Sequence, residues 1–298
     1  MSDDLGFFLL LMSNGVLIGL MYSLIALGFV LVYKATDAIN FAQGEFVMIA
    51  GFVAAGFLVA YGAPLWLAVA AALGGMIGFG FGLERVMLRR LIGRPIIAVV
   101  MATIGLAAIL RGVGPLTWGA ETKPLPLPIR DEPFVLGPIF ISPIQVLGAT
   151  VSIIFLAAFG WFFLKSRKGV AMRAVADSQQ VAMSMGINVE RYFALAWAMT
   201  GVVSALGGII WGSLLGVDVF LSLVGFKVFP VVILGGLDSI PGAIVGGLIV
   251  GIVENVAAGY IDPYVGGGTK DFAPYVLMIV ALMIRPYGIF GKQIIERV

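Results

Sequence analysis

The sequence predicts an all-α integral membrane protein, a polytopic helical bundle of about 8–9 transmembrane spans at roughly 20 residues per span. Hydrophobic residues make up 61% of the 298 residues and charged residues only 11%. A soluble domain carries about 25% charged residues. The apolar residues also gather in long runs that are separated by short polar segments. Composition and spacing therefore indicate the same fold class.

Nine apolar segments are candidate spans. In chain order they are residues 7–33, 40–61, 65–83, 96–113, 141–164, 193–215, 220–237, 241–260 and 272–284. The first is long enough to be tilted, or broken near Asn14 and Gly15. It follows an N-terminus without the basic residues of a signal peptide, so we expect it to be retained. The polar, proline-rich segment 114–138 is too short for a domain, and we expect a small hairpin or a lid there.

The Lys and Arg residues favour one side of the predicted membrane. With nine crossings and Met1 outside, one side receives 13 of the 18, namely Lys34, Arg85, Arg89, Arg90, Arg94, Lys165, Arg167, Lys168, Arg173, Arg191, Arg285, Lys292 and Arg297. The other side receives Arg111, Lys123, Arg130 and Lys270, while Lys227 lies within a span. Because basic loops stay in the cytoplasm, we expect the N-terminus outside and the C-terminus inside.

Two segments are poorly formed as plain helices. Segment 40–61 contains NFAQGEF, and segment 220–237 contains GFKVFP before LGGLDSIPG. Each follows the opening span of its half, with halves 1–140 and 141–298 that run in opposite directions across the membrane. Interrupted segments at matching positions predict a single transmembrane domain, residues 1–298, with an inverted repeat and broken helices. The pathway or its gate is then expected at Asn40, Gln43, Gly44 and Glu45.

Other glycines are better explained by close packing of helices. Small residues four apart let helix backbones approach each other in a membrane. This pattern occurs at Gly74, Gly78 and Gly82, at Gly242 and Gly246, and at Gly247 and Gly251. We expect these glycines to serve helix contacts and not the pathway.

Glu45, Lys227 and Glu254 lie inside predicted spans, where each charge needs water, a donor or a counter-charge. Glu45 has two interpretations: it accepts backbone N–H bonds near Gly44, or it lines the pathway and contacts the solute. Lys227 and Glu254 are expected at similar depths, roughly 13 and 10 Å from the outer surface at 1.5 Å per helical residue. They are predicted to form an ion pair. The alternative is that Lys227 extends outward while Glu254 faces a water-filled cavity.

The segment 165–192, KSRKGVAMRAVADSQQVAMSMGINVERY, separates the fifth and sixth spans. At 100° per residue, 170–185 forms one amphipathic helix beside the membrane. Its apolar face would hold Val170, Ala171, Ala174, Val175, Val181, Ala182 and Met185. Its polar face would hold Arg173, Asp177, Gln180 and Ser184, and Gly186 stands at the C′ position. Basic contact with headgroups and docking of a cytoplasmic partner both remain open for this helix.

Several chemistries are excluded by composition. The chain has no Cys and no His, which removes disulfides, thiolate or imidazole metal ligands and His-based triads. No phosphate-binding loop of the type G-x-x-x-x-G-K-[ST] is present, so this chain is not expected to hydrolyse ATP. We expect no enzyme activity, no metal and no cofactor. The net charge of +2 argues for no particular partner, and no nucleic-acid partner is expected.

Three stretches together resemble one known family. They are INFAQGEF at 39–46, the run GFKVFPVVILGGLDSIPGAIVGGLIVGIVE at 225–254, and Gln180-Val181-Ala182 followed by Gly186 and GINVERY. The last is similar to the EAA-x-x-x-G coupling loop of ABC importer permeases. The whole resembles the branched-chain amino acid permeases of ABC importers, and the similarity extends from the first span to the last.

The resemblance implies an inner-membrane permease of a bacterial importer for branched-chain amino acids or related small polar solutes, such as other amino acids, amides or urea. Its implied partners are two cytoplasmic ATPase subunits that bind ATP, a homologous second permease chain, a periplasmic binding protein and membrane lipids. Coupling to the ATPase would involve Arg173, Asp177, Gln180, Val181, Ala182 and Gly186. The alternative is a stand-alone secondary transporter or channel that uses Glu45, Glu254 and Lys227 as coupling charges.

Overall fold

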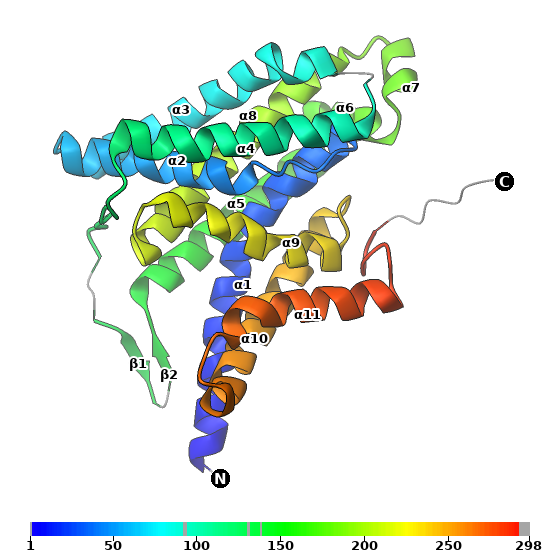
Figure 1. Cartoon of the computed structure of the whole chain (residues 1–298). Coiled ribbons are helices and arrows are strands. Elements are labelled where there is room, and N and C mark those ends of the chain that lie inside the picture. Colours follow the sequence, from blue (N-terminus) through cyan, green and yellow to red (C-terminus); the bar gives the residue numbers. More distant parts are fainter. Residues whose placement is uncertain (1, 92–93, 130–131, 138, 292–298) are drawn as a thin grey trace. The chain divides into compact units, whose positions relative to one another are not determined.

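The computed structural model describes residues 2–91, 94–129, 132–137 and 139–291, and within them the fold is almost entirely helical (Figure 1). Arg130, Lys292 and Arg297, which entered the charge comparison above, lie outside the described residues. The α-helices are α1 Ser2–Thr36, α2 Gln43–Ala55, α3 Leu65–Val86, α4 Ile96–Trp118, α5 Pro143–Lys165, α6 Arg167–Asp177, α7 Gln179–Ser184, α8 Val189–Leu215, α9 Leu223–Gly235, α10 Ile240–Val265 and α11 Thr269–Ile284.

Within the described part of the chain, seven helices are long and apolar enough to cross a membrane. They are Asp4–Thr36, Gln43–Ala60, Leu65–Leu91, Ile96–Trp118, Pro143–Lys165, Val189–Leu215 and Ile240–Val265. The other two predicted spans correspond to shorter helices, Val219–Gly235 and α11 with its 16 residues. At 1.5 Å per residue these reach about 24–26 Å, less than the ~30 Å hydrocarbon core. The predicted class, a polytopic α-helical membrane protein, is confirmed, and the count of 8–9 spans is approximate.

The chain divides into two compact units. One comprises Met1–Ala26, Pro128–Ile154 and Phe226–Val298, and the other comprises Leu27–Leu127 and Phe155–Gly225. We call them the terminal unit and the central unit. Each unit contains segments from both predicted sequence halves, so the two units do not correspond to the two halves. The division into one domain with an inverted repeat stays a prediction.

Glycines bring the helices of the terminal unit into backbone contact. A Cβ added at Gly19 of α1 would lie 2.8 Å from Leu248 Cα of α10, and one at Gly15 would lie 2.7 Å from Ile252 Cα. Helix α1 is continuous through Asn14 and Gly15. The glycine lets the backbone of α10 approach closely. The neighbouring glycines of α10 likewise meet backbone of α9 or α1, which confirms the predicted packing role of Gly242, Gly246, Gly247 and Gly251.

In the central unit the close contact lies between α3 and α8, and it uses different glycines from those expected. A Cβ at Gly80 or at Gly201 would collide with the backbone of the facing helix. The buried stripe of α3 repeats every four residues and ends at Gly80 and Glu84. The packing role predicted for Gly74, Gly78 and Gly82 is wrong within this chain, since nothing lies within 4 Å of a Cβ at these positions. They share the four-residue spacing but lie on another face.

A small antiparallel hairpin precedes α5 (Figure 1). Its strands are β1 Phe134–Leu136 and β2 Ile139–Ile141, with Phe134 opposite Ile141. A hairpin was expected within segment 114–138, but the hairpin that forms extends past the end of this segment, since β2 lies beyond residue 138. The start of the segment, as far as Trp118, belongs to α4.

Candidate functional site

A break between α1 and α2 places polar side chains inside the central unit. Asp37 has a φ of 54°, an uncommon value for a residue with a side chain, and turns the backbone out of α1. Asn40 then folds over the start of α2, since its Oδ1 accepts from Ala42 N at 3.1 Å and its Nδ2 donates to Gln43 Oε1 at 3.3 Å. Asn40 is fully buried, so this local hydrogen bonding replaces the missing helical contacts.

Gln43 and Gly44 fix α2 against its neighbours. Gln43 Nε2 donates to Ser204 Oγ of α8 at 3.1 Å, and the side chain is fully buried. The Gln43 amide also lies where a side chain on Gly28 of α1 would stand. A Cβ at Gly44 would collide with the Ser222 carbonyl. Glycine is therefore required at position 44 by the close approach of another backbone segment.

Glu45 is neutralised by a residue that the sequence did not indicate. Its carboxylate is 1% exposed and forms an ion pair with Arg111 of α4, whose side chain is 44% exposed. Glu45 also lies in the first turn of α2, where a negative charge interacts favourably with the helix dipole. The structure thus gives the charge a partner different from both the backbone N–H groups and the solute considered above. Arg111 was counted with the outer side, near the end of the predicted span 96–113, and only the packing of α4 on α2 brings it to Glu45.

A second charge cluster lies in the terminal unit. Lys227 Nζ of α9 lies 3.5 Å from Glu254 Oε1 of α10 and 2.7 Å from Asp271 Oδ1 of α11. Lys270 Nζ lies 4.0 Å from the same Glu254 oxygen. Glu254 is fully buried, and Tyr22 of α1 lies against its carboxylate. The two residues considered together from sequence thus lie within ion-pair distance, and Asp271 and Lys270 extend the cluster.

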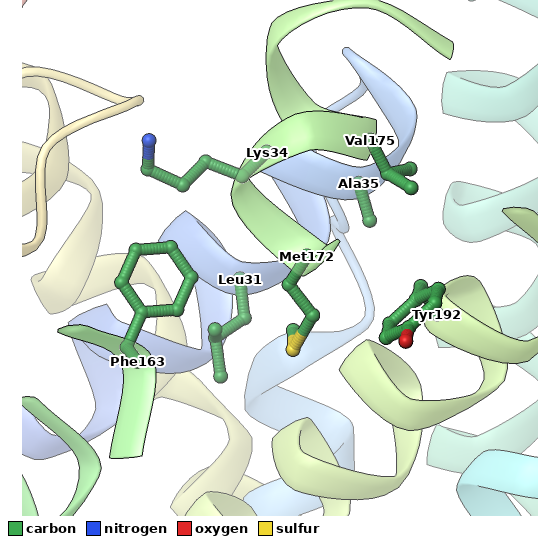
Figure 2. A pocket seen from close by; sticks show the side chains of 7 residues that line it. All are labelled: Leu31, Lys34, Ala35, Phe163, Met172, Val175 and Tyr192. Carbon is green, nitrogen blue, oxygen red and sulfur yellow. The ribbon is translucent and has the colours of Figure 1, made fainter. Parts of the chain in front are cut away.

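Within the central unit, the apolar face of α6 packs the basic loop against α1, α5 and α8. Figure 2 shows Met172 of α6 beside Leu31 of α1 and Val175 of α6 beside Ala35 of α1, while Phe163 and Tyr192 line the same small space. The space left among these side chains is about 10 Å³, no more than one water molecule occupies.

Two cations flank the Phe163 ring at this contact. Lys34 Nζ lies 6.0 Å from the ring centroid, and Arg173 Cζ lies 5.8 Å from it. Arg173 also donates to the Leu164 carbonyl at 3.3 Å. Such cation–π contacts contribute about 0.5–1 kcal/mol each at exposed sites. Arg173 therefore helps to fix α6 on the central unit.

The single helix predicted over residues 170–185 is wrong, because the chain forms α6 and α7 with a break at Ser178. Ser178 has extended φ and ψ of −162° and 113°, and its hydroxyl accepts from Val181 N, capping α7. A serine that caps a helix resembles a serine on a polar face in sequence alone. The expected polar face is consequently divided, with Arg173 and Asp177 on α6 and Gln180 and Ser184 on α7.

Helix α7 presents apolar side chains to the outside. Val181 is 60% exposed and Met185 is 77% exposed, whereas Ala182 is buried. The helix ends as expected at Gly186, whose φ is 79°. Gly186 N donates to the Met183 carbonyl and Ile187 N to the Ala182 carbonyl, each at 3.0 Å. This Schellman motif turns the chain sharply toward α8.

A charge network joins the exit of this loop to α3. Arg89 Nε and Nη2 donate to both oxygens of Glu84 at 3.2 Å, and Nη1 lies 3.1 Å from Glu190 at the start of α8. Glu84 is 2% exposed. Sequence reasoning counted Arg89 only as a cation of the basic side. The five-residue spacing of Glu84 and Arg89 gave no signal, because only residues three or four apart are neighbours on a helix. The two meet because α3 ends at Val86, before Arg89.

These clusters provide fixed charges and hydrogen bonds, and not the groups of a metal centre. Among the described residues, no group of three or more His, Cys, Asp or Glu side chains is placed to hold a metal ion. The arrangement combines apolar helices, buried paired charges at helix breaks and an exposed apolar helix on a basic loop. It suits a membrane transport protein that contacts another protein.

Comparison with known proteins gives a consistent result. A family model described as "Branched-chain amino acid transport system / permease component" matches residues 11–284. The chain is 34% identical to the high-affinity branched-chain amino acid transport system permease protein LivH of Escherichia coli K12, over all of both chains. It is 32% identical to BraD of Pseudomonas aeruginosa over 96% of both chains. It is 30% identical to a probable LivH of Methanocaldococcus jannaschii, covering 90% of this chain and 88% of that protein.

Proposed function

Because the chain belongs to the family of branched-chain amino acid transport permeases, we propose that it is the permease subunit of an ATP-driven importer. Its solute would be a branched-chain amino acid or a related small polar molecule, such as another amino acid, an amide or urea. Full-length similarity to relatives that are named as permeases for branched-chain amino acids supports this choice.

The observation that carries the ATP-driven mechanism is the exposed apolar surface of α7. Val181 and Met185 are more than half exposed on a loop that also carries Lys165, Arg167 and Lys168. An apolar surface bordered by polar residues is typical of a protein interaction site. The adjoining helix α6 is fixed on the central unit, so α7 is held outward on a firm base. We assign this surface to an ATPase subunit.

The rest of the assembly follows from this role. Two cytoplasmic ATPase subunits would bind ATP, a homologous second permease chain would complete the pathway, and a periplasmic binding protein would deliver the solute. The excess of Lys and Arg on one side supports a cytoplasmic loop 165–192, an outside N-terminus and a cytoplasmic C-terminus. The chain itself would carry no cofactor, and the membrane would be the bacterial inner membrane.

A stand-alone transporter has less support. Such a mechanism needs an intramembrane carboxylate that is free to exchange a proton or a cation. Glu45 is paired with Arg111, and Glu254 is paired with Lys227. Buried pairs of this kind are costly to separate, which favours a positioning role for these charges.

The docking surface is tested by retention of the ATPase subunits during purification in mild detergent. We expect Val181→Glu and Met185→Glu to lose the ATPase subunits, because each places a charge in an apolar contact. Val170→Glu is the matched control, since Val170 is 51% exposed on α6 and lies outside α7. Full retention in both α7 variants, or equal loss in the control, would contradict docking through α7.

A further inference from the structure

A large cavity lies beside the exit of the basic loop, in the central unit. It measures about 560 Å³ and is lined by Phe81 of α3, Lys168 of α6, the connection Gly186–Asn188, and Arg191, Tyr192 and Leu195 of α8. Its size falls within the roughly 300–1,000 Å³ of small-molecule sites. The cavity adjoins the proposed docking surface at Gly186, but Val181 and Met185, which form that surface, do not line it.

Two cations of the cavity have no counter-charge among the described residues. None of the ion pairs found there involves Lys168 or Arg191, and no Asp or Glu is among the described residues that line the cavity. The nearest acidic residue in sequence, Glu190, is paired with Arg89. The cavity therefore presents uncompensated positive charge, which attracts an anion.

Two apolar side chains of the candidate spanning helices α3 and α8, Phe81 and Leu195, also line the cavity. Phe81 is 43% exposed and lies near the end of α3. Only 22% of the apolar stretch of this span is buried within the chain. Leu195 lies in the second turn of α8. A ligand that fits both the cationic and the apolar lining has an anionic group and an apolar chain. Anionic lipids have both, and basic pockets between spanning helices on the cytoplasmic side bind their headgroups.

We propose that this cavity binds an anionic phospholipid. Its phosphate pairs with Lys168 and Arg191, and the first part of an acyl chain lies against Phe81 and Leu195. Because Gly186–Asn188 forms another wall, the bound lipid braces the connection between α7 and α8. The site rests on the cavity itself and not on the identity of the transported solute.

The test titrates the delipidated full-length chain with phosphatidylglycerol and counts bound lipid by native mass spectrometry. We expect Lys168→Gln/Arg191→Gln to weaken binding by about thirty-fold, the effect of two cations beside an anionic headgroup. Arg85→Gln/Arg90→Gln is the matched control, because both side chains are exposed cations of the same basic region outside the cavity. The control should bind within about two-fold of the unmodified chain, and phosphatidylcholine should bind weakly to all.

Further arms separate the lipid from other anions. Phe81→Ala should also weaken phosphatidylglycerol binding, whereas inorganic phosphate at millimolar concentration should not displace the lipid. Equal loss in the control pair, displacement by phosphate, or unchanged binding in Lys168→Gln/Arg191→Gln would each overturn the proposal. If that double variant keeps its lipid but loses the ATPase subunits, the cavity belongs to a protein contact and the lipid site is wrong. Failure of this lipid test leaves the transport role standing, because the α7 variants examine that separately.

Discussion

Lys227→Met should destabilise the protein more than Glu254→Leu does, although the two residues form one ion pair. Lys227 Nζ and Glu254 Oε1 are 3.5 Å apart, and at an effective dielectric constant of 20 their attraction is about 5 kcal/mol. Removing Lys227 leaves a fully buried carboxylate whose remaining cation among the described ion pairs is Lys270, with its Nζ at 4.0 Å. The expected loss in the free energy of unfolding is about 3–5 kcal/mol.

Removing Glu254 has a smaller effect because Lys227 keeps a partner. Its side chain is 27% exposed and still lies 2.7 Å from Asp271. The expected loss is about 1.5–3 kcal/mol, the range for one hydrogen bond to a charged group. In the double variant Lys227→Met/Glu254→Leu no buried carboxylate remains, so it should be more stable than Lys227→Met alone.

The assay is denaturant unfolding in detergent, followed by the fluorescence of the five Trp residues. Asp271→Asn is the control, because Asp271 is 74% exposed and an exposed ion pair contributes about 0–1 kcal/mol. Strictly additive losses in the double variant would refute the reasoning, since they would show that the two charges do not interact. A larger loss for Glu254→Leu than for Lys227→Met would refute the assigned asymmetry.

Three further tests concern the Glu45–Arg111 ion pair, the close contact at Gly44 and the turn at Gly186. Arg111→Gln should cost about 3–5 kcal/mol by stranding buried Glu45, while Glu45→Gln should cost about 1.5–3 kcal/mol because Arg111 is half-exposed; equal unfolding midpoints would contradict this order. Gly44→Ala should abolish solute uptake because its Cβ meets a facing carbonyl, whereas Gly78→Ala, with open space around it, should not; normal uptake in Gly44→Ala would show that the contact yields. Gly186→Val should lower ATPase retention through about 1 kcal/mol or more of strain at positive φ; unchanged retention would exclude a role for this turn.

The sequence was informative where a local pattern determines the structure. The nine apolar segments contain helices, Gly186 ends α7 in a Schellman motif, and Lys227 lies within ion-pair distance of Glu254. These features depend on run length, on backbone conformation, and on adjacent helices joined by a short loop. Each can be worked out from a few neighbouring residues.

Other features depended on tertiary contacts that no local pattern records. Arg111 reaches Glu45 across 66 residues, and only the packing of α4 on α2 pairs them. Four-residue spacing occurs on two faces of α3, but α8 covers the face of Gly80 and not that of Gly78. The break at Ser178 was not predicted, because a serine that caps a helix and a serine exposed to solvent within a helix look the same in sequence.

The central claim is that transport by this chain is driven by ATP on partner subunits. The most direct measurement is uptake of labelled leucine into proteoliposomes that contain this chain, with and without the ATPase subunits, the second permease chain and the binding protein. Uptake should require all of these components, with ATP on the side of the membrane that carries the ATPase subunits. It should not depend on a proton or sodium gradient. Gradient-driven uptake by this chain alone, without ATP, would contradict the account.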